Sequence, residues 1–234
     1  MKRFYKLVSV EKSDNGYHIL LDGRAVKTKS KAHLSCLNKD IANEVMQEWA
    51  QQGAQIIPDS MPFTQIESTR IDRVSAERQA MSANVLKYLD TDLICYVAAS
   101  PEELVEEQNK KWALWRTWFG DKFKCKLDTT TGLAALKQDA RAHKAAAEYT
   151  EKLDDARFTI LQIVTPLSGS LILGLSFIDG ASNADDIFAA SYVEEHFKDT
   201  LYDAQKYGRD PLLEKQQNAA IKDLTAAQKY LSFL

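Results

Sequence analysis

The chain has 234 residues, 45% of them hydrophobic, which is enough to bury a substantial core in one or two domains. The 30 Lys and Arg residues against 33 Asp and Glu residues give a net charge of −3, and this balance argues against a general nucleic-acid binder. Cys36, Cys95 and Cys125 are widely spaced and odd in number, so they predict neither a disulfide framework nor a zinc site and favour a reducing compartment.

The N-terminal segment predicts an antiparallel meander of short strands. Strand-forming residues at 4–10, 17–21 and 25–28 are separated by the turn sequences Asp14–Asn15–Gly16 and Asp22–Gly23. The second turn, with Arg24, is alternatively a phosphate-binding or catalytic loop. One glycine is too few for a phosphate cradle, and the chain has no G-x-x-x-x-G-K-[ST] motif. We therefore interpret residues 22–24 as a hairpin turn.

Helices are predicted over most of the remaining chain. The first covers residues 38–53, with Asn38 as its N-cap and Gly53 as its end. Helical patterns dominate after Pro62. Residues 100–103 have the pattern of a capping box that opens a helix, on which Trp112, Trp115 and Trp118 have the spacing of core residues. Further helices are predicted near 137–153, 183–206 and 210–232.

Two local charge patterns have simple interpretations. In KFKCKL, residues 122–127, lysines alternate with apolar residues, which predicts a half-buried strand with a solvated lysine face. Arg70, Asp72 and Arg73 are expected to form a surface ion-pair cluster on a helix.

Residues 158–178 form a long apolar stretch that approaches the length of a membrane span. Polar residues, Pro166 and Gly169 interrupt its middle, so we expect two buried helices that meet there and no membrane insertion. The N-terminus is basic but lacks an apolar stretch of signal-peptide length, which favours a cytoplasmic protein. We predict an α+β protein with a small β-rich N-terminal domain (1–63, with one helix) and a larger all-helical C-terminal domain (64–234).

The segment DDIFAASYVEEHFKDTLY, residues 185–202, has apolar residues on two sides of a predicted helix. Glu195 falls within the stripe formed by Phe188, Tyr192 and Tyr202, and Glu194 flanks the opposite stripe. A carboxylate in such a place either is partly buried with a partner or forms the polar edge of a contact surface, and spacing leaves both open. The chain has no H-E-x-x-H, G-x-S-x-G or dinucleotide motif, and its four histidines lack metal-spaced partners.

A series of motifs resembles one family over essentially the whole chain. In order they are YHILLDGRAVKT (17–28), EWAQQGAQIIPDSMPFTQ (48–65), IDRV (71–74), YLDTDLICY (88–96), PEELVEEQNKKW (101–112), GSLIL (169–173) and VEEHF (193–197). They resemble the chaperone family that binds the alpha subunit of the ATP synthase (F-type ATPase) catalytic sector during its assembly, known from mitochondria and alphaproteobacteria.

The resemblance implies a non-enzymatic holdase without a cofactor or metal, which occupies a free alpha subunit before the beta subunit arrives. It implies a β-rich N-terminal domain, a helical C-terminal domain and a monomer when free, in the bacterial cytoplasm or, for eukaryotic relatives, the mitochondrial matrix. The important acidic residue of the family matches Glu195 first and Glu194 second. The expected partner-binding residues are Glu195, Glu194, Tyr192, Phe188 and Tyr202.

Two other functions remain open on the sequence. One is a small-molecule enzyme in which Glu194, Glu195 and Asp199 would converge in one pocket with Arg78 or Arg73 as an anion anchor. The other is a helical scaffold with a different client.

Overall fold

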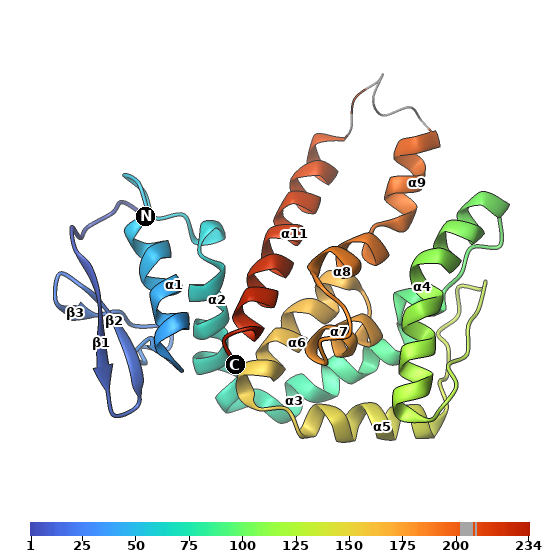
Figure 1. The fold of residues 1–234 in the computed structure, drawn as a ribbon, viewed down its shortest axis with the longest axis horizontal. Coiled ribbons are helices and arrows are strands. Elements are labelled where there is room, and N and C mark those ends of the chain that lie inside the picture. The colour runs from blue at the N-terminus through green and yellow to red at the C-terminus, as the bar shows by residue number, and fades with distance from the viewer. Residues whose placement is uncertain (202–207, 209) are drawn as a thin grey trace. The chain divides into compact units, whose positions relative to one another are not determined.

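The structure, a computed structural model, describes residues 1–201, 208 and 210–234. Two compact units are present: Met1–Arg78 together with Lys229–Leu234, and Gln79–Gln228. A small antiparallel sheet in the first unit is followed along the chain by helices, which confirms the predicted α+β class (Figure 1). The predicted domain boundary between residues 63 and 64 stays a prediction.

The sheet is built around β2 (Gly16–Leu21), which pairs antiparallel with β1 (Val8–Ser13), β3 (Arg24–Ala25) and β4 (Ser35–Cys36). The predicted meander and its turn are confirmed. Asp22 and Gly23 have φ values of 48° and 79°, which are the two positive φ values of a type I′ turn. The Asp22 carboxylate accepts the backbone N–H of Leu7 at 2.8 Å, so its charge serves the turn.

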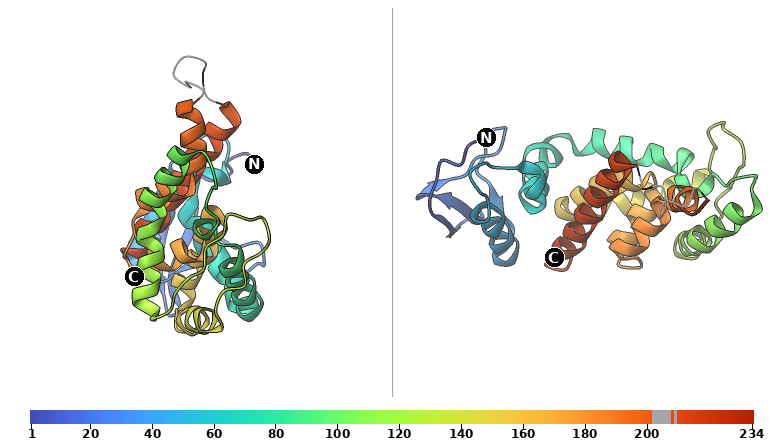
Figure 2. Two further views of the ribbon diagram at one scale, coloured as in Figure 1. Left: turned by 90° about the vertical axis from the view of Figure 1, so that its right-hand side faces the viewer. Right: turned by 90° about the horizontal axis from the view of Figure 1, so that it is seen from above.

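Helix α1 (Lys39–Ala50) packs against the sheet (Figure 2). Its N-cap is Asn38, as predicted, because the Asn38 side chain accepts the backbone N–H of Ile41 at 2.9 Å. Its apolar side, including Ile41, Val45 and Trp49, is buried. The helix ends at Gln51, two residues before the predicted Gly53.

The chain continues through α2 (Pro62–Thr69), a π-helical segment (Arg70–Val74) and α3 (Ser75–Leu86). The predicted surface cluster of Arg70, Asp72 and Arg73 is wrong. Arg70 donates to the fully buried Glu67 at 2.6 Å. Asp72 accepts from the Thr28 hydroxyl at 2.5 Å, and only Arg73 forms an exposed ion pair, with Glu77 at 3.7 Å. A helical pattern shows which residues share a face of the helix. It does not show that the hydrogen-bond partner of Asp72 is Thr28, in a loop far away in the sequence.

The end of α11 (Pro211–Leu231) completes the core of the first unit. The Tyr230 hydroxyl donates to Glu67 Oε1 at 2.5 Å, and Arg70 donates to Glu67 Oε2. Burial raises the pKa of Glu67, and the neighbouring Arg70 guanidinium opposes that rise. A buried carboxylate is tolerated when its oxygens are paired, as they are here.

The second unit contains the remaining helices. They are α4 (Glu102–Phe123), α5 (Ala140–Glu151), α6 (Asp155–Ser168), α7 (Leu171–Ile178), α8 (Ala184–Ser191) and α9 (Val193–Leu201), with 3₁₀ turns at Lys87–Thr91 and Leu93–Cys95. Residues 158–178 form two buried helices that meet at Gly169, as predicted. Gly174 permits their close approach, since a Cβ there would lie 2.6 Å from Thr165 Oγ1. No helix among the described residues is long and apolar enough to cross a membrane.

Two local predictions are wrong. Lys122 and Phe123 belong to α4 instead of a strand, although the alternation of buried Cys125 and Leu127 with exposed Lys126 is present in the extended chain that follows. Residues 100–103 form no capping box, because Pro101 itself is the N-cap and makes no side-chain hydrogen bond.

The start of α7 depends on the carboxylate of Asp92, which is fully buried. It accepts the backbone N–H of Ile172 at 3.0 Å, close to the positive end of the helix dipole. Burial raises the pKa of Asp92 to about 7, against the lowering effect of these hydrogen bonds. Asp92 lies in the motif YLDTDLICY, so this motif has a structural role.

Tyr230→Phe removes the hydroxyl that donates to Glu67. We expect the free energy of unfolding to fall by about 1–3 kcal/mol, because a buried carboxylate oxygen loses a donor. Denaturant unfolding measures the change. Tyr17→Phe is the matched control, because the Tyr17 hydroxyl has no hydrogen-bond partner among the described residues. An equal effect of both substitutions would contradict the role of the buried group.

Asp92 should make stability depend on pH. Its folded pKa lies above the ordinary value of 3.8, so the folded state binds more protons than the unfolded state between about pH 4 and pH 7. The contribution of Asp92 to the free energy of unfolding is therefore present below pH 4 and is lost as the pH rises through about 7. Unfolding curves of the wild type and Asp92→Asn across this range should diverge, with the wild type losing stability relative to the variant. Parallel pH profiles would show that Asp92 does not titrate in this window.

Candidate partner-binding site

The predicted helix over residues 183–206 is interrupted. Helix α8 ends at Tyr192, whose φ and ψ of −116° and 25° are not helical, and α9 begins at Val193. Phe188 and Glu195, which the sequence pattern assigns to one stripe of a continuous helix, therefore lie on different sides of the break. A break also leaves backbone carbonyls without intrahelical partners.

Helix α4 supplies partners on both sides of the break. The indole Nε1 of Trp112 donates to the Ala190 carbonyl at 2.8 Å, and the Nε2 of Gln108 donates to Glu194 Oε1 at 2.9 Å. Trp112 and Gln108 are both buried, and Gln108 Oε1 accepts the backbone N–H of Ala98 at 2.7 Å. Since these residues are one helical turn apart, they form a pair, here called the α4 clamp, that fixes α8 and α9 on α4.

Glu194 and Glu195 therefore have different environments. Glu194 is half-buried and accepts from the α4 clamp. Glu195 is also half-buried but forms no hydrogen bond or ion pair with another described residue. It lies near Tyr192, where burial first and the Glu195 charge second raise the pKa of the tyrosine. Of the two carboxylates, Glu195 is thus the one without a hydrogen bond or ion pair among the described residues.

The aromatic residues predicted beside the acidic pair lie together. Phe188 and Tyr192 have ring centroids 4.9 Å apart, and Phe188 and His196 are 5.8 Å apart. All three are half-buried, so they offer surface to a partner as well as to the core. Tyr202, the remaining predicted site residue, lies outside the described residues.

Helix α4 packs against α8 and α9, and Figure 1 shows where these helices lie in the fold. A groove with a volume of about 460 Å³ is lined by residues of all three helices. Glu103, Glu106 and Glu107 of α4 line it on one side, and Ala189, Val193 and Phe197 on the other. The sequence pattern does not predict this groove. The spacing of the three glutamates already places them on one face of a helix, but it does not reveal which helix lies opposite.

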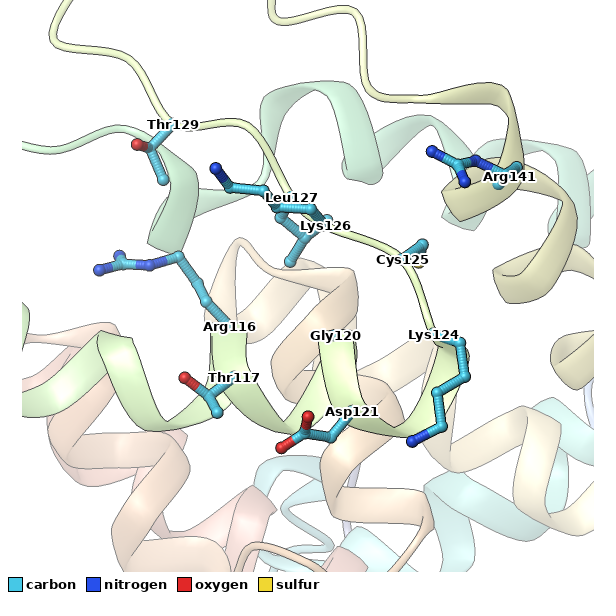
Figure 3. A pocket seen from close by; sticks show the side chains of 10 residues that line it. All are labelled: Arg116, Thr117, Gly120, Asp121, Lys124, Cys125, Lys126, Leu127, Thr129 and Arg141. Atoms are coloured by element: carbon cyan, nitrogen blue, oxygen red, sulfur yellow. The ribbon is translucent and has the colours of Figure 1, made fainter.

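A second pocket of about 610 Å³ is largely basic (Figure 3). Its cationic side chains extend in different directions from separate elements and do not converge on one point. Arg116 already donates to the Ile94 carbonyl at 2.6 Å, and Arg141 pairs with Asp139 at 2.8 Å. This geometry does not provide a focused anion site.

The residues expected for a small-molecule enzyme do not line the same pocket. Neither the groove, nor the basic pocket, nor a third pocket around Tyr5 and Trp49 is lined by Glu194, Glu195, Asp199, Arg73 or Arg78. Among the described residues, no cluster of His, Cys, Asp and Glu has metal-binding geometry. The best-defined candidate site is the acidic and aromatic surface of α8–α9 with its adjoining groove.

Comparisons with known proteins show the family of the chain. A model of the ATP12 chaperone protein family matches residues 2–120. The crystal structure of Atp12 from Paracoccus denitrificans is 29% identical and superimposes with a TM-score of 0.85, covering 99% of this chain and 97% of that one. A candidate chaperone from Agrobacterium tumefaciens is 28% identical with a TM-score of 0.88, covering 99% and 85% of the two chains.

Fold and family together define the class of the protein, which is a chaperone. More particularly, the chain belongs to the ATP12 chaperone family. The resemblance to ATP synthase assembly chaperones that the sequence motifs indicated is confirmed.

The two glutamates should respond differently to substitution. Glu194→Leu leaves the buried Gln108 amide without its acceptor, so we expect the free energy of unfolding to fall by about 1–3 kcal/mol. Glu195→Leu should change it by less than about 0.5 kcal/mol. Chemical denaturation measures both values, and Glu194→Gln, which keeps an acceptor oxygen, should restore most of the loss. Equal destabilisation by the two leucine substitutions would contradict the assignment.

Proposed function

We propose that the protein is an assembly chaperone for the ATP synthase catalytic sector, which binds the free alpha subunit before it pairs with beta. The observation that supports this proposal most directly is the match to the ATP12 chaperone family, together with the similarity to Atp12 over 99% of the chain. The α4 clamp, which fixes Glu194 and leaves Glu195 beside a half-buried aromatic cluster, supports Glu195 as a contact residue. Membership in the ATP12 family supports the choice of client.

The proposed mechanism is shielding. An alpha subunit without beta exposes apolar surface that is otherwise buried in the assembled sector, and such surface promotes aggregation. Phe188 and Tyr192 would cover part of it, and Glu195 would pair with a polar or basic group at its edge. No catalysis or cofactor is required, because release follows when beta offers a larger interface.

The same proposal includes the oligomeric state, the compartment and the stoichiometry of binding. The chaperone would act as a monomer in the bacterial cytoplasm, where the alpha subunit is made, and would bind one alpha subunit at a time. Moderate affinity suffices, because a complex that is too stable would delay transfer to beta.

Co-expression with the alpha subunit of the same organism tests the proposal. We expect a one-to-one complex on size exclusion and in native mass spectrometry, and we expect added beta subunit to displace the chaperone. Absence of a complex, with an alpha subunit that is folded and soluble alone, would refute the choice of client.

Glu195→Lys should impair this complex while leaving the fold intact. The substitution places a positive charge where we expect a polar or basic client group, and like charges at an interface disfavour association. The dissociation constant should rise at least about tenfold, an effect of about 1.4 kcal/mol. Circular dichroism and a thermal melt provide the control. Loss of folding in this variant would make Glu195 a structural residue instead.

A further inference from the structure

The groove between α4 and α8–α9 has chemistry that specifies a kind of occupant. Its two walls differ: Glu103, Glu106 and Glu107 line the α4 side, whereas Ala189, Val193 and Phe197 line the other. The glutamates are three and four residues apart and therefore share one face of α4. The apolar residues follow one another at intervals of four residues, across the helix break. Acidic residues thus line one side of the groove, and apolar residues line the other side.

The acidic wall is only partly neutralised by its neighbours. Glu107 pairs with Lys110 at 2.7 Å. Glu103 and Glu106 are exposed and form no hydrogen bond or ion pair with another described residue. Lys111 is the cationic lysine of the groove lining, and His196 lies at the apolar side. The three carboxylates therefore still outnumber the two ammonium groups of Lys110 and Lys111, and the local field favours a cationic ligand.

The apolar wall provides surface for an anchor. Val193 is buried, whereas Ala189 and Phe197 are half-buried, so part of their area faces the groove. An aliphatic side chain placed there would gain burial free energy. A groove of this construction fits an amphipathic helix better than a small molecule.

We propose that this groove binds a basic amphipathic segment of the client, with aliphatic side chains on Ala189, Val193 and Phe197 and Lys or Arg side chains on Glu103 and Glu106. The inference rests on the proposed function for the identity of the client. It adds a second contact to the surface around Glu195 and specifies the charge and shape of the segment that is bound.

The test uses the full chain with two matched double variants. Glu103→Gln with Glu106→Gln removes two charges three residues apart from the groove. Glu148→Gln with Glu151→Gln removes two charges with the same spacing from exposed positions of α5, outside the groove. Because both variants change the net charge equally, any difference between them reports the groove.

Titration calorimetry with the alpha subunit should show the difference. At about 50 mM salt the groove variant should bind about three- to tenfold more weakly than wild type, whereas the α5 variant should differ by less than twofold. At about 500 mM salt the difference should largely disappear, because salt screens exposed charges. Equal affinities of the two variants would overturn the inference and leave the proposed function intact.

A synthetic peptide provides a probe that does not depend on the identity of the client. One helical peptide carries Leu on one face and Lys on the other, and its control carries Glu in place of Lys. The Lys peptide should bind wild type and lose affinity for the groove variant, and the Glu peptide should not bind. Failure of the alpha subunit to bind wild type, with the Lys peptide still bound in the groove, would refute the proposed client and keep the chemistry of the groove. Equal binding of the Lys peptide to wild type and groove variant would refute that chemistry.

Discussion

The hydrogen bond from Trp112 to the Ala190 carbonyl is the constraint on which the candidate site depends. A continuous helix over 184–201 would use that carbonyl internally, and the break at Tyr192 makes it available. Gln108 then fixes the other side of the break through Glu194. Helix α4 thus holds the end of α8 through Trp112 and the start of α9 through Gln108.

In the first unit, hydrogen bonds of a buried carboxylate connect segments that are far apart in the sequence. Glu67 accepts from both Arg70 and Tyr230, and Arg70 also donates to the Ser35 carbonyl at 2.7 Å. Asp72, two residues further on, binds the Thr28 hydroxyl. The motifs DGRAVKT and IDRV are therefore joined in space by hydrogen bonds. Folding therefore explains the polar residues Asp22, Thr28 and Asp72 of these motifs.

The sequence was most informative where local backbone chemistry decides the structure. The Asp22–Gly23 turn, the Asn38 cap and the meeting of two buried helices at Gly169 all follow from a few neighbouring residues. The sequence was misleading where the local structure depends on a residue far away in the chain. Neither the contact of Asp72 with Thr28 nor the break at Tyr192 can be derived from helical periodicity, because the stabilising groups come from elsewhere in the chain. The groove was missed for the same reason, since its two walls belong to helices far apart in sequence.

The ambiguity between Glu194 and Glu195 has the same physical origin. Consecutive residues of a helix point about 100° apart, so two adjacent carboxylates cannot both face the same neighbour. The sequence shows the pair but not the side on which α4 lies. Once Gln108 engages Glu194, the adjacent carboxylate is directed away from that amide, toward Tyr192 and the aromatic cluster. A buried amide on a different helix therefore determines which of two chemically identical residues has a hydrogen bond within the described part of the chain.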